Sequence, residues 1–331
     1  MNLYSLRNRI TILALALAVG ASAVMAQNGG NALGTPGNSF EAGAPSIVPH
    51  GVNKTEGAAP TAGTTGALSP ISNHGGTVMG TPTPYLIWYG NWNQTNHSDT
   101  PDGQQIVRDF LYGDSNSAYF ALNTTYTGPN GSAPTGAINY SGVTGVHEMT
   151  VAGSGTLSDN GVATIVSNAI NSGKLGAKDP NGVYFVLTSS DINKTGFCSQ
   201  YCGWHTHGSL GGTDIKYSFV GNANRCLSHC AAQTISPNGN AGVDGMVSVI
   251  AHELEETTTD PDLNAWYDGS GAENADKCAW TFGQKLLQSG GAYYNQTLPK
   301  PGGGGATRNY LIQRNLSSVD NKCYLGLGGA Q

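Results

Sequence analysis

Continuous apolar runs mark the strands that the chain is expected to form. TPYLIWYGNW at residues 83–92 and GVYFVLTSSD at residues 182–191 carry aliphatic and aromatic side chains without interruption, as buried strands do. VHEMTV at residues 146–151 alternates between apolar and polar positions like a half-buried strand. DIKYSFVGN at residues 214–222 predicts the next strand, and RNYLIQRN at residues 308–315 predicts a late one.

Segments with helical spacing lie between these runs. GQQIVRDFLYG at residues 103–113 and NSAYFALNTTY at residues 116–126 predict two helical stretches. In the segment 158–175, Ser158 or Asp159 can cap a helix with one apolar face. VDGMVSVIAHELEETT at residues 243–258 predicts a further amphipathic helix.

Strands and amphipathic helices therefore alternate through the first two-thirds of the chain. This order favours one α/β or α+β domain around a mixed sheet. The part from Asp260 onward is rich in glycine and irregular in pattern. We expect a single folded domain over residues 77–331. A zincin-like topology is compatible with this order of elements.

The N-terminal residues predict export. Arg7 and Arg9 precede the apolar run 10–19, and Val24-Met25-Ala26 offers a cleavage site, which is the layout of a secretory signal peptide. Residues 27–76 are mostly small and polar and predict a disordered linker. We expect a secreted protein, extracellular or periplasmic, with no membrane segment once residues 1–26 are removed.

Charge excludes some partners. Only 11% of residues are charged and the formal net charge is −6, which becomes −8 when the two signal-peptide arginines leave. Because basic residues do not cluster, we expect no nucleic-acid partner. We expect a monomer that acts on a peptide or cell-surface substrate.

The cysteines predict disulfide bonds. Their number is even, and export places them in an oxidising compartment, so three disulfides are favoured over a zinc-thiolate site. The pairing stays open among the six: Cys198, Cys202, Cys226, Cys230, Cys278 and Cys323.

One motif carries candidate chemistry. His252, Glu253 and Glu256 spell H-E-x-x-E, one letter from the H-E-x-x-H motif of zinc hydrolases. On a helix, His252 and Glu256 share one face and can hold one cation, while Glu253 is placed as a general base. The competing interpretation is a solvated acidic helix end, with Glu255 and Glu256 in water and a half-buried His252.

Two segments can complete the metal site. GSGAENADKCAW supplies Glu273 and Asp276 some twenty residues after the helix. CGWHTHGS supplies His205 and His207, which would face one side of an extended segment. Asp260, before Pro261, is expected to end the helix instead. We predict Zn²⁺, with Ca²⁺ as the alternative because carboxylates favour hard ions.

Several blocks together resemble the EXORDIUM-like family, also called phosphate-induced proteins. They include YLIWYGNW, VYFVLTSSDI, GFCSQYCGWHTHGS, YSFVGNANRC and PNGNAGVDGMVSVIAHELEETTTDPDLNAWYD. The resemblance implies an extracellular protein without a firmly defined biochemical activity. We expect a microbial branch of this family that carries a zincin-like H-E-x-x-E helix.

The leading hypothesis is a secreted metal-dependent hydrolase similar to zinc metallopeptidases. In it, His252 and Glu256 bind the ion, Glu273 or Asp276 completes the site, and Glu253 is the base. The alternative is a non-catalytic extracellular or cell-wall-associated protein, with a structural metal or none.

Overall fold

The structure is a computed structural model and describes residues 68–329. The predicted signal peptide and most of the predicted linker lie outside the described residues. The last linker residues are described and belong to the folded part, because Ile71 is buried and Ser72–Asn73 (β1) pairs with Trp266–Tyr267 (β9). The folded part therefore includes residues before residue 77, the predicted start of the domain.

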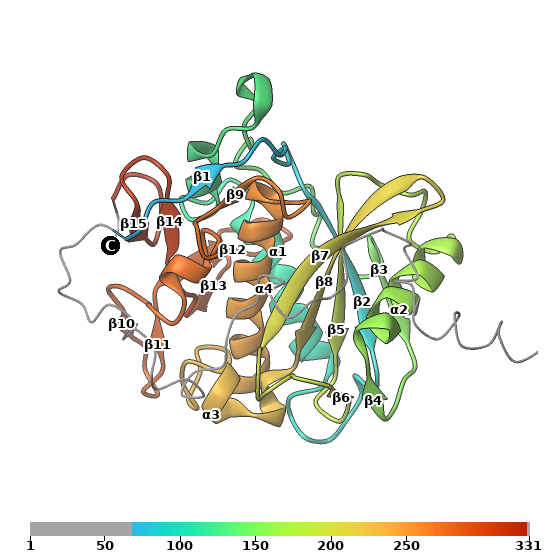
Figure 1. Cartoon of the computed structure of the whole chain (residues 1–331). Coiled ribbons are helices and arrows are strands. Elements are labelled where there is room, and N and C mark those ends of the chain that lie inside the picture. The colour runs from blue at the N-terminus through green and yellow to red at the C-terminus, as the bar shows by residue number, and fades with distance from the viewer. Residues whose placement is uncertain (1–67, 330–331) are drawn as a thin grey trace, which may run out of the picture.

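A five-stranded mixed sheet forms the centre of the molecule (Figure 1). Its strand order is β3-β2-β5-β8-β7. The first four strands of that order run parallel, and the edge strand β7 runs antiparallel to β8. The strands are β2 (Thr83–Tyr89), β3 (Glu148–Val151), β5 (Gly182–Thr188), β7 (Gly203–Leu210) and β8 (Thr213–Gly221).

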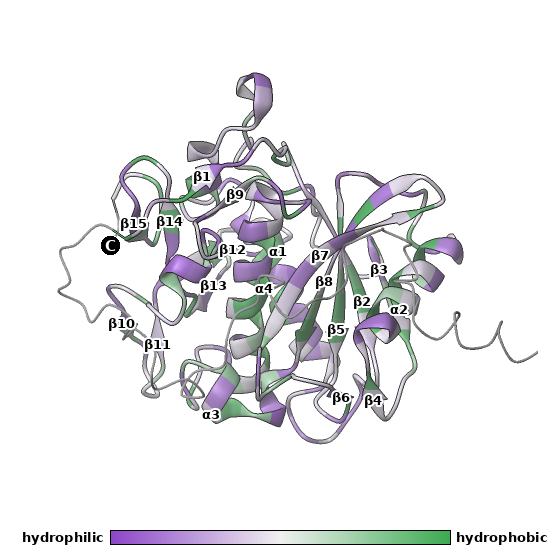
Figure 2. Cartoon of the chain, viewed as in Figure 1, coloured by the Kyte–Doolittle hydropathy of each residue, from purple (hydrophilic) through white to green (hydrophobic). Residues whose placement is uncertain are grey.

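The central strands are apolar because both of their faces are covered. Every residue of β5 is buried, and so is every residue of β2 except Tyr89. Figure 2 shows β2, β5 and β8 mainly in the hydrophobic colour. Continuous runs of this kind are expected for parallel strands between two layers of helices.

Helices cover the two faces. The helix α2 (Asp159–Asn171) packs on one face against β5 and β8, whereas α4 (Ala241–Thr259) packs on the other against β7 and β8 (Figure 1). Helix α1 (Pro101–Asp114) lies against α4. Side-chain caps begin α1 and α2, with Thr100 accepting from Gly103 N and Ser158 from Gly161 N.

Helix α4 is enclosed by the rest of the protein. Every residue from Gly242 to Thr259 is buried, so the helix has no solvent face. Asn240 caps its N-terminus by accepting from Val243 N, and Asp260 follows its last residue, as predicted from the sequence. The hydroxyls of the three terminal threonines donate to carbonyls of the preceding turn, which satisfies them inside the protein.

The remaining elements are short. Small two-stranded sheets make up much of the C-terminal third, on the side of α4 away from the sheet (Figure 1). Their strands are β10 (Leu286–Leu287), β11 (Tyr293–Tyr294), β12 (Gln296–Pro299), β13 (Thr307–Tyr310), β14 (Asn315–Ser317) and β15 (Lys322–Tyr324). The other short strands and helix are β4 (Thr156–Leu157), β6 (Asn193–Lys194) and α3 (Leu227–Cys230). The 3₁₀ turns are η1 (Phe120–Thr125), η2 (Pro129–Gly131), η3 (Ala223–Arg225) and η4 (Asp276–Cys278).

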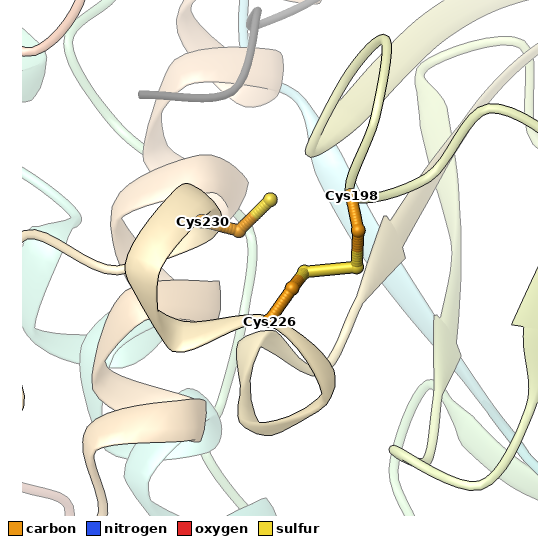
Figure 3. Close-up of side chains that lie close together, drawn as sticks. All are labelled: Cys198, Cys226 and Cys230. Atoms are coloured by element: carbon orange, nitrogen blue, oxygen red, sulfur yellow. A yellow bond between two sulfur atoms is a disulfide. The ribbon is translucent and has the colours of Figure 1, made fainter. Parts of the chain in front are cut away.

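All six cysteines form disulfides, as predicted. The pairs are Cys198–Cys226, Cys202–Cys230 and Cys278–Cys323. Figure 3 shows Cys230 beside the Cys198–Cys226 bond. The first two bonds tie α3 and the turn before it to the segment that leads into β7.

The predicted fold class is confirmed: the protein is a mixed α+β structure. Most predicted strands and helices occur close to their expected positions. The stretch 116–126 contains the 3₁₀ turn η1 rather than a regular helix, and the strand predicted over residues 308–315 is divided between β13, which ends at Tyr310, and β14, which begins at Asn315. The zincin-like topology stays a prediction. Within residues 68–329, no helix has the length and apolar character needed to cross a membrane.

Candidate metal centre

Three segments bring histidine and carboxylate side chains to one place beside α4. Helix α4 contributes His252, Glu253 and Glu256. The segment around η4 contributes Glu273 and Asp276. The third segment is the edge strand β7, whose His205 faces the helix. Together they form two groups of potential ligands that have Glu256 in common.

The first group consists of three residues that were predicted from the sequence. His252 Nε2 lies 2.9 Å from Glu256 Oε1, the helical i, i+4 pair, and 3.4 Å from Asp276 Oδ1. The backbone N–H of Asp276 also donates to Glu256 Oε1 over 3.0 Å, which fixes η4 against the helix. Donor atoms that share one cation at about 2.0–2.2 Å lie about 3.0–3.6 Å apart, so this spacing suits a metal ion.

The second group contains His205, Glu256 and Glu273. His205 Nδ1 lies 3.5 Å from Glu256 Oε2 and 3.4 Å from Glu253 Oε2, and His205 Nε2 lies 3.8 Å from Glu273 Oε2. Glu273 therefore belongs to this group rather than to the first. The two oxygens of Glu256 face different histidines.

These side chains are buried and lack hydrogen-bond partners at many of their polar atoms. The side chain of Asp276 is 20% exposed, whereas those of the two histidines and three glutamates have no exposed surface. A buried polar atom without a hydrogen-bond partner lowers the stability of the fold, so a cluster of such atoms needs an explanation. The atoms without partners are both ring nitrogens of His205, Nε2 of His252, both oxygens of Glu253 and Glu273, and Oε2 of Glu256.

Electrostatics distinguishes the three glutamates. Burial raises the pKa of Glu253 to about 7 and raises that of Glu273 well above its ordinary value, with the charge on Glu256 adding to the second effect. Burial also acts to raise the pKa of Glu256, but His252 and His205 outweigh it and bring the pKa to about 2. Glu256 is therefore the carboxylate that stays ionised.

The two histidines are the main source of positive charge. Burial acts to lower the pKa of His205, but the adjacent carboxyl groups of Glu253 and Glu256 outweigh it and raise the pKa to about 9. For His252, the charge on Glu256 outweighs the same burial effect and raises the pKa well above its ordinary value. The acids thus favour a cation at this place, whether a proton or a metal ion.

Gln313 lies behind His252. Its side-chain amide contacts Nδ1 of His252, and its backbone N–H donates to Ser248 Oγ over 3.2 Å. Oε1 of Gln313 is buried and has no partner. Rotating the amide by 180° places this oxygen at Nδ1, where it accepts the proton of an imidazole that binds a cation through Nε2.

Glu255 lies on another side of α4 and is not part of the site. Its Oε2 accepts from Asn315 Nδ2 over 2.6 Å, and the side chain is fully buried. The solvated-acid interpretation is therefore wrong, because Glu255 and Glu256 are both without solvent exposure.

His207 belongs to a separate cluster. Its Nδ1 lies 2.9 Å from Asp214 Oδ1, and Lys216 Nζ lies 2.6 Å from Asp214 Oδ2 and 3.2 Å from Asp262 Oδ1. Lys216 already supplies positive charge there. The structure thus brings His205 to the centre and leaves the second histidine of the predicted pair outside it.

Two residues of the centre had only weak signals in the sequence. His205 appeared only as an alternative ligand, and Gln313 did not appear at all. Its signal is a lone amide directly after Tyr310, Leu311 and Ile312, in a stretch that is otherwise buried and apolar. A polar residue in such a run is expected to have a specific buried partner.

Comparison with known proteins agrees with the sequence blocks. Residues 71–324 match the family described as "Phosphate-induced protein 1 conserved region". Protein EXORDIUM-like 3 of Arabidopsis thaliana is 31% identical over 275 residues, which cover 73% of this chain and 78% of that protein. Protein EXORDIUM-like 5 of the same plant is 30% identical over 264 residues, covering 69% of each chain.

A shorter match extends to another plant. Protein PHOSPHATE-INDUCED 1 of Nicotiana tabacum is 36% identical over 109 residues, which cover 27% of this chain and 34% of that protein. No solved structure matches the chain. The assignment to a microbial branch stays a prediction. Since the family match spans most of the chain, the protein belongs to the EXORDIUM-like, phosphate-induced protein family.

Proposed function

We propose that the protein is a secreted metal-dependent hydrolase whose cation is bound by His252, Glu256 and Asp276. The observation that carries this proposal is the convergence of three donor atoms from α4 and η4 within 4.8 Å of one another. The buried Nε2 of His252 has no hydrogen-bond partner, as expected for a nitrogen that binds a metal ion. The donor set fits a divalent cation.

Zn²⁺ suits this donor set better than Ca²⁺. Calcium takes six to eight oxygen ligands and rarely uses imidazole, whereas zinc binds imidazole and carboxylate together in sites of low coordination number. With His252 in the first group and His205 beside Glu256, nitrogen donors form a substantial part of the centre. We therefore propose Zn²⁺ as the bound ion.

Glu253 is the proposed general base. When bound, the cation would acidify a water molecule and polarise an ester or amide carbonyl. Both oxygens of Glu253 lack hydrogen-bond partners, so one of them can accept the proton of that water. Peptides are the first substrate class to test.

Burial supports a second candidate. His252, Glu253, Glu256 and Glu273 have no exposed surface, and only the Asp276 side chain reaches solvent in this group. A cation held this deeply can also act by joining η4 to α4, as in structural metal sites. This second candidate is a non-catalytic extracellular protein that a metal ion stabilises.

Secretion is part of the proposal. It is supported by the N-terminal signal-peptide pattern and by the three disulfides, which form and persist in oxidising compartments. Immunoblotting of culture medium and cell pellet tests it, with a chain that lacks residues 1–26 as the control. The intact chain should accumulate in the medium or in a periplasmic extract of the pellet, and retention of both chains in the rest of the pellet would contradict secretion.

Metal analysis of the purified protein tests the cation. The wild type should carry Zn²⁺, and His252→Ala should lose the ion bound through His252. His207→Ala is the matched control, because it removes a histidine from the same region without touching the centre. Equal and negligible zinc in the wild type and His252→Ala would refute the proposal.

Hydrolysis of fluorogenic peptides then distinguishes the two candidates. In the hydrolase, Glu253→Gln should lower kcat by about 10²–10⁴-fold, while the bound zinc is retained. Zinc binding together with rates that Glu253→Gln does not change would favour the structural candidate.

A further inference from the structure

We propose that the centre binds two divalent cations and that Glu256 bridges them. This inference rests on the proposed function for its first ion and adds a second site made by His205, Glu256 and Glu273. The edge strand β7 thereby becomes part of the metal centre rather than a neighbour of it.

The geometry of Glu256 supports a bridge. Oε1 of its carboxylate lies 2.9 Å from His252 Nε2, and Oε2 lies 3.5 Å from His205 Nδ1. A carboxylate whose two oxygens face two different imidazoles can bind one cation with each oxygen. Paired cations in hydrolytic enzymes are about 3.5–4 Å apart, a distance that one carboxylate spans.

The charge of the centre also favours two ions. Glu253, Glu256, Glu273 and Asp276 carry four carboxyl groups, and none of the ion pairs within residues 68–329 joins any of them to a lysine or arginine. With all four ionised, one divalent cation would leave two negative charges in a place where only Asp276 has exposed surface, and buried ions are costly. Two divalent cations neutralise all four.

The second site has buried polar atoms that no hydrogen bond in the described residues satisfies. His205 has no exposed surface, and neither of its ring nitrogens has a hydrogen-bond partner. Both oxygens of Glu273 also lack hydrogen-bond partners, and Oε2 lies 3.8 Å from Nε2 of His205. These side chains converge from a strand and a loop that are far apart in sequence, so local chain geometry does not account for their meeting.

The competing account is a set of shared protons. In it, His205 and His252 are protonated, Glu273 is neutral, and the centre holds at most one metal ion. The two accounts predict different numbers of bound ions, so stoichiometry decides between them.

The first experiment counts ions. The full secreted chain is equilibrated with Zn²⁺, passed through a desalting column and analysed for zinc per mole of protein. We expect two in the wild type and in His207→Ala, one in His205→Ala, and one in His252→Ala. Glu273→Gln, which is nearly isosteric, should also reduce the count to one, and it keeps the test valid if His205→Ala does not fold.

Three outcomes would count against the second site. One ion in the wild type, lost in His252→Ala and retained in His205→Ala, would overturn this inference and leave the proposed function intact. No ion in the wild type would overturn both. A count of two that falls to one in His207→Ala but not in His205→Ala would place the second ion at the His207 cluster and overturn it as well.

The second experiment tests the bridge. With Mn²⁺ as the probe, two ions joined by Glu256 should give the electron paramagnetic resonance spectrum of an exchange-coupled pair. In His205→Ala, the six-line spectrum of an isolated ion should appear. A wild-type protein with two Mn²⁺ ions that shows only isolated-ion spectra would contradict the bridge.

Discussion

At the scale of single residues, the centre depends on side chains that hold the donors in place. Gln313 is the clearest of these, because its amide contacts the ring nitrogen of His252 that faces away from Glu256. Ligands that are oriented in this way bind their cation more tightly, since the ring does not have to be ordered when the ion arrives.

We predict that Gln313→Leu weakens zinc binding by about 10–100-fold, because the apolar side chain offers no acceptor to Nδ1 of His252. Gln313→Glu is the matched control: it keeps an acceptor at the same place, and its affinity should stay within a few-fold of the wild type. Competition with a chromophoric chelator measures all three affinities. Equal values in the three proteins would show that Gln313 does not orient the ligand.

Asp114 provides a test of pH dependence away from the donors. Burial raises the pKa of this carboxyl from 3.8 to about 7, although a hydrogen bond from Ser117 acts in the opposite direction. Between these two pH values the unfolded chain releases the proton and the folded protein keeps it. The free energy of unfolding therefore falls as pH rises through this window, by at most about 4 kcal/mol from this group.

We predict that Asp114→Asn removes this fall in the free energy of unfolding with rising pH. The amide oxygen of the variant can still accept from Ser117, and the side chain does not ionise. Urea unfolding should give a variant that gains stability over the wild type between pH 4 and pH 8. If the free energies of unfolding of the two proteins differ by the same amount at both pH values, Asp114 is not the group with the raised pKa.

At the scale of elements, the centre exists because β7 approaches α4 closely. Gly203 begins this strand, and a Cβ at that position would lie 2.6 Å from Val249 Cγ1 and 2.9 Å from Glu253 Oε1. Real Cβ atoms are not found so close to other atoms. Because Gly203 has no side chain, the strand can approach the helix closely enough for His205 to lie beside it.

We predict that Gly203→Ala lowers the free energy of unfolding by about 1–3 kcal/mol and weakens zinc binding, because strand and helix must separate. Gly80→Ala is the matched control, since a Cβ there would have no atom within 4 Å. Urea unfolding and zinc titration measure the two effects. If both variants behave alike, close contact between β7 and α4 is not needed.

At the scale of the whole molecule, distant parts of the chain meet at α4. The sheet lies on one side of this helix, and the C-terminal hairpins and η4 lie on the other (Figure 1). The Cys278–Cys323 disulfide joins η4 to β15 across 45 residues and lies two residues after Asp276. It restricts the segment that supplies the proposed ligands Glu273 and Asp276.

We predict that replacing Cys278 and Cys323 by alanine lowers the free energy of unfolding by about 4 kcal/mol through the entropy of the unfolded chain. The same change should weaken zinc binding, because η4 loses its covalent tie. Replacing Cys198 and Cys226 is the control: this pair closes a span of 28 residues, and its loss should cost about 3.5 kcal/mol with little effect on zinc. Equal zinc affinities in both double variants would contradict this role.

Local patterns predicted much of this protein correctly. The apolar runs identified β2, β5 and β8, and the helical spacing of residues 243–258 identified α4 with His252 and Glu256 on one face. An i, i+4 pair is fixed by the rise and turn of a helix, so it follows from the sequence alone. The even number of cysteines, together with the predicted signal peptide, likewise predicted that all would be bonded.

Tertiary structure alone decided what surrounds that pair. His205 meets Glu256 because the edge strand β7 packs on α4, and Gln313 meets His252 across 61 residues of sequence. The same packing decided which histidine Asp276 and Glu273 each approach, which cysteines form disulfides with one another, and that α4 is completely buried. These contacts depend on how strands and helices pack in three dimensions, and residue order and spacing along the chain do not encode that packing in any local pattern.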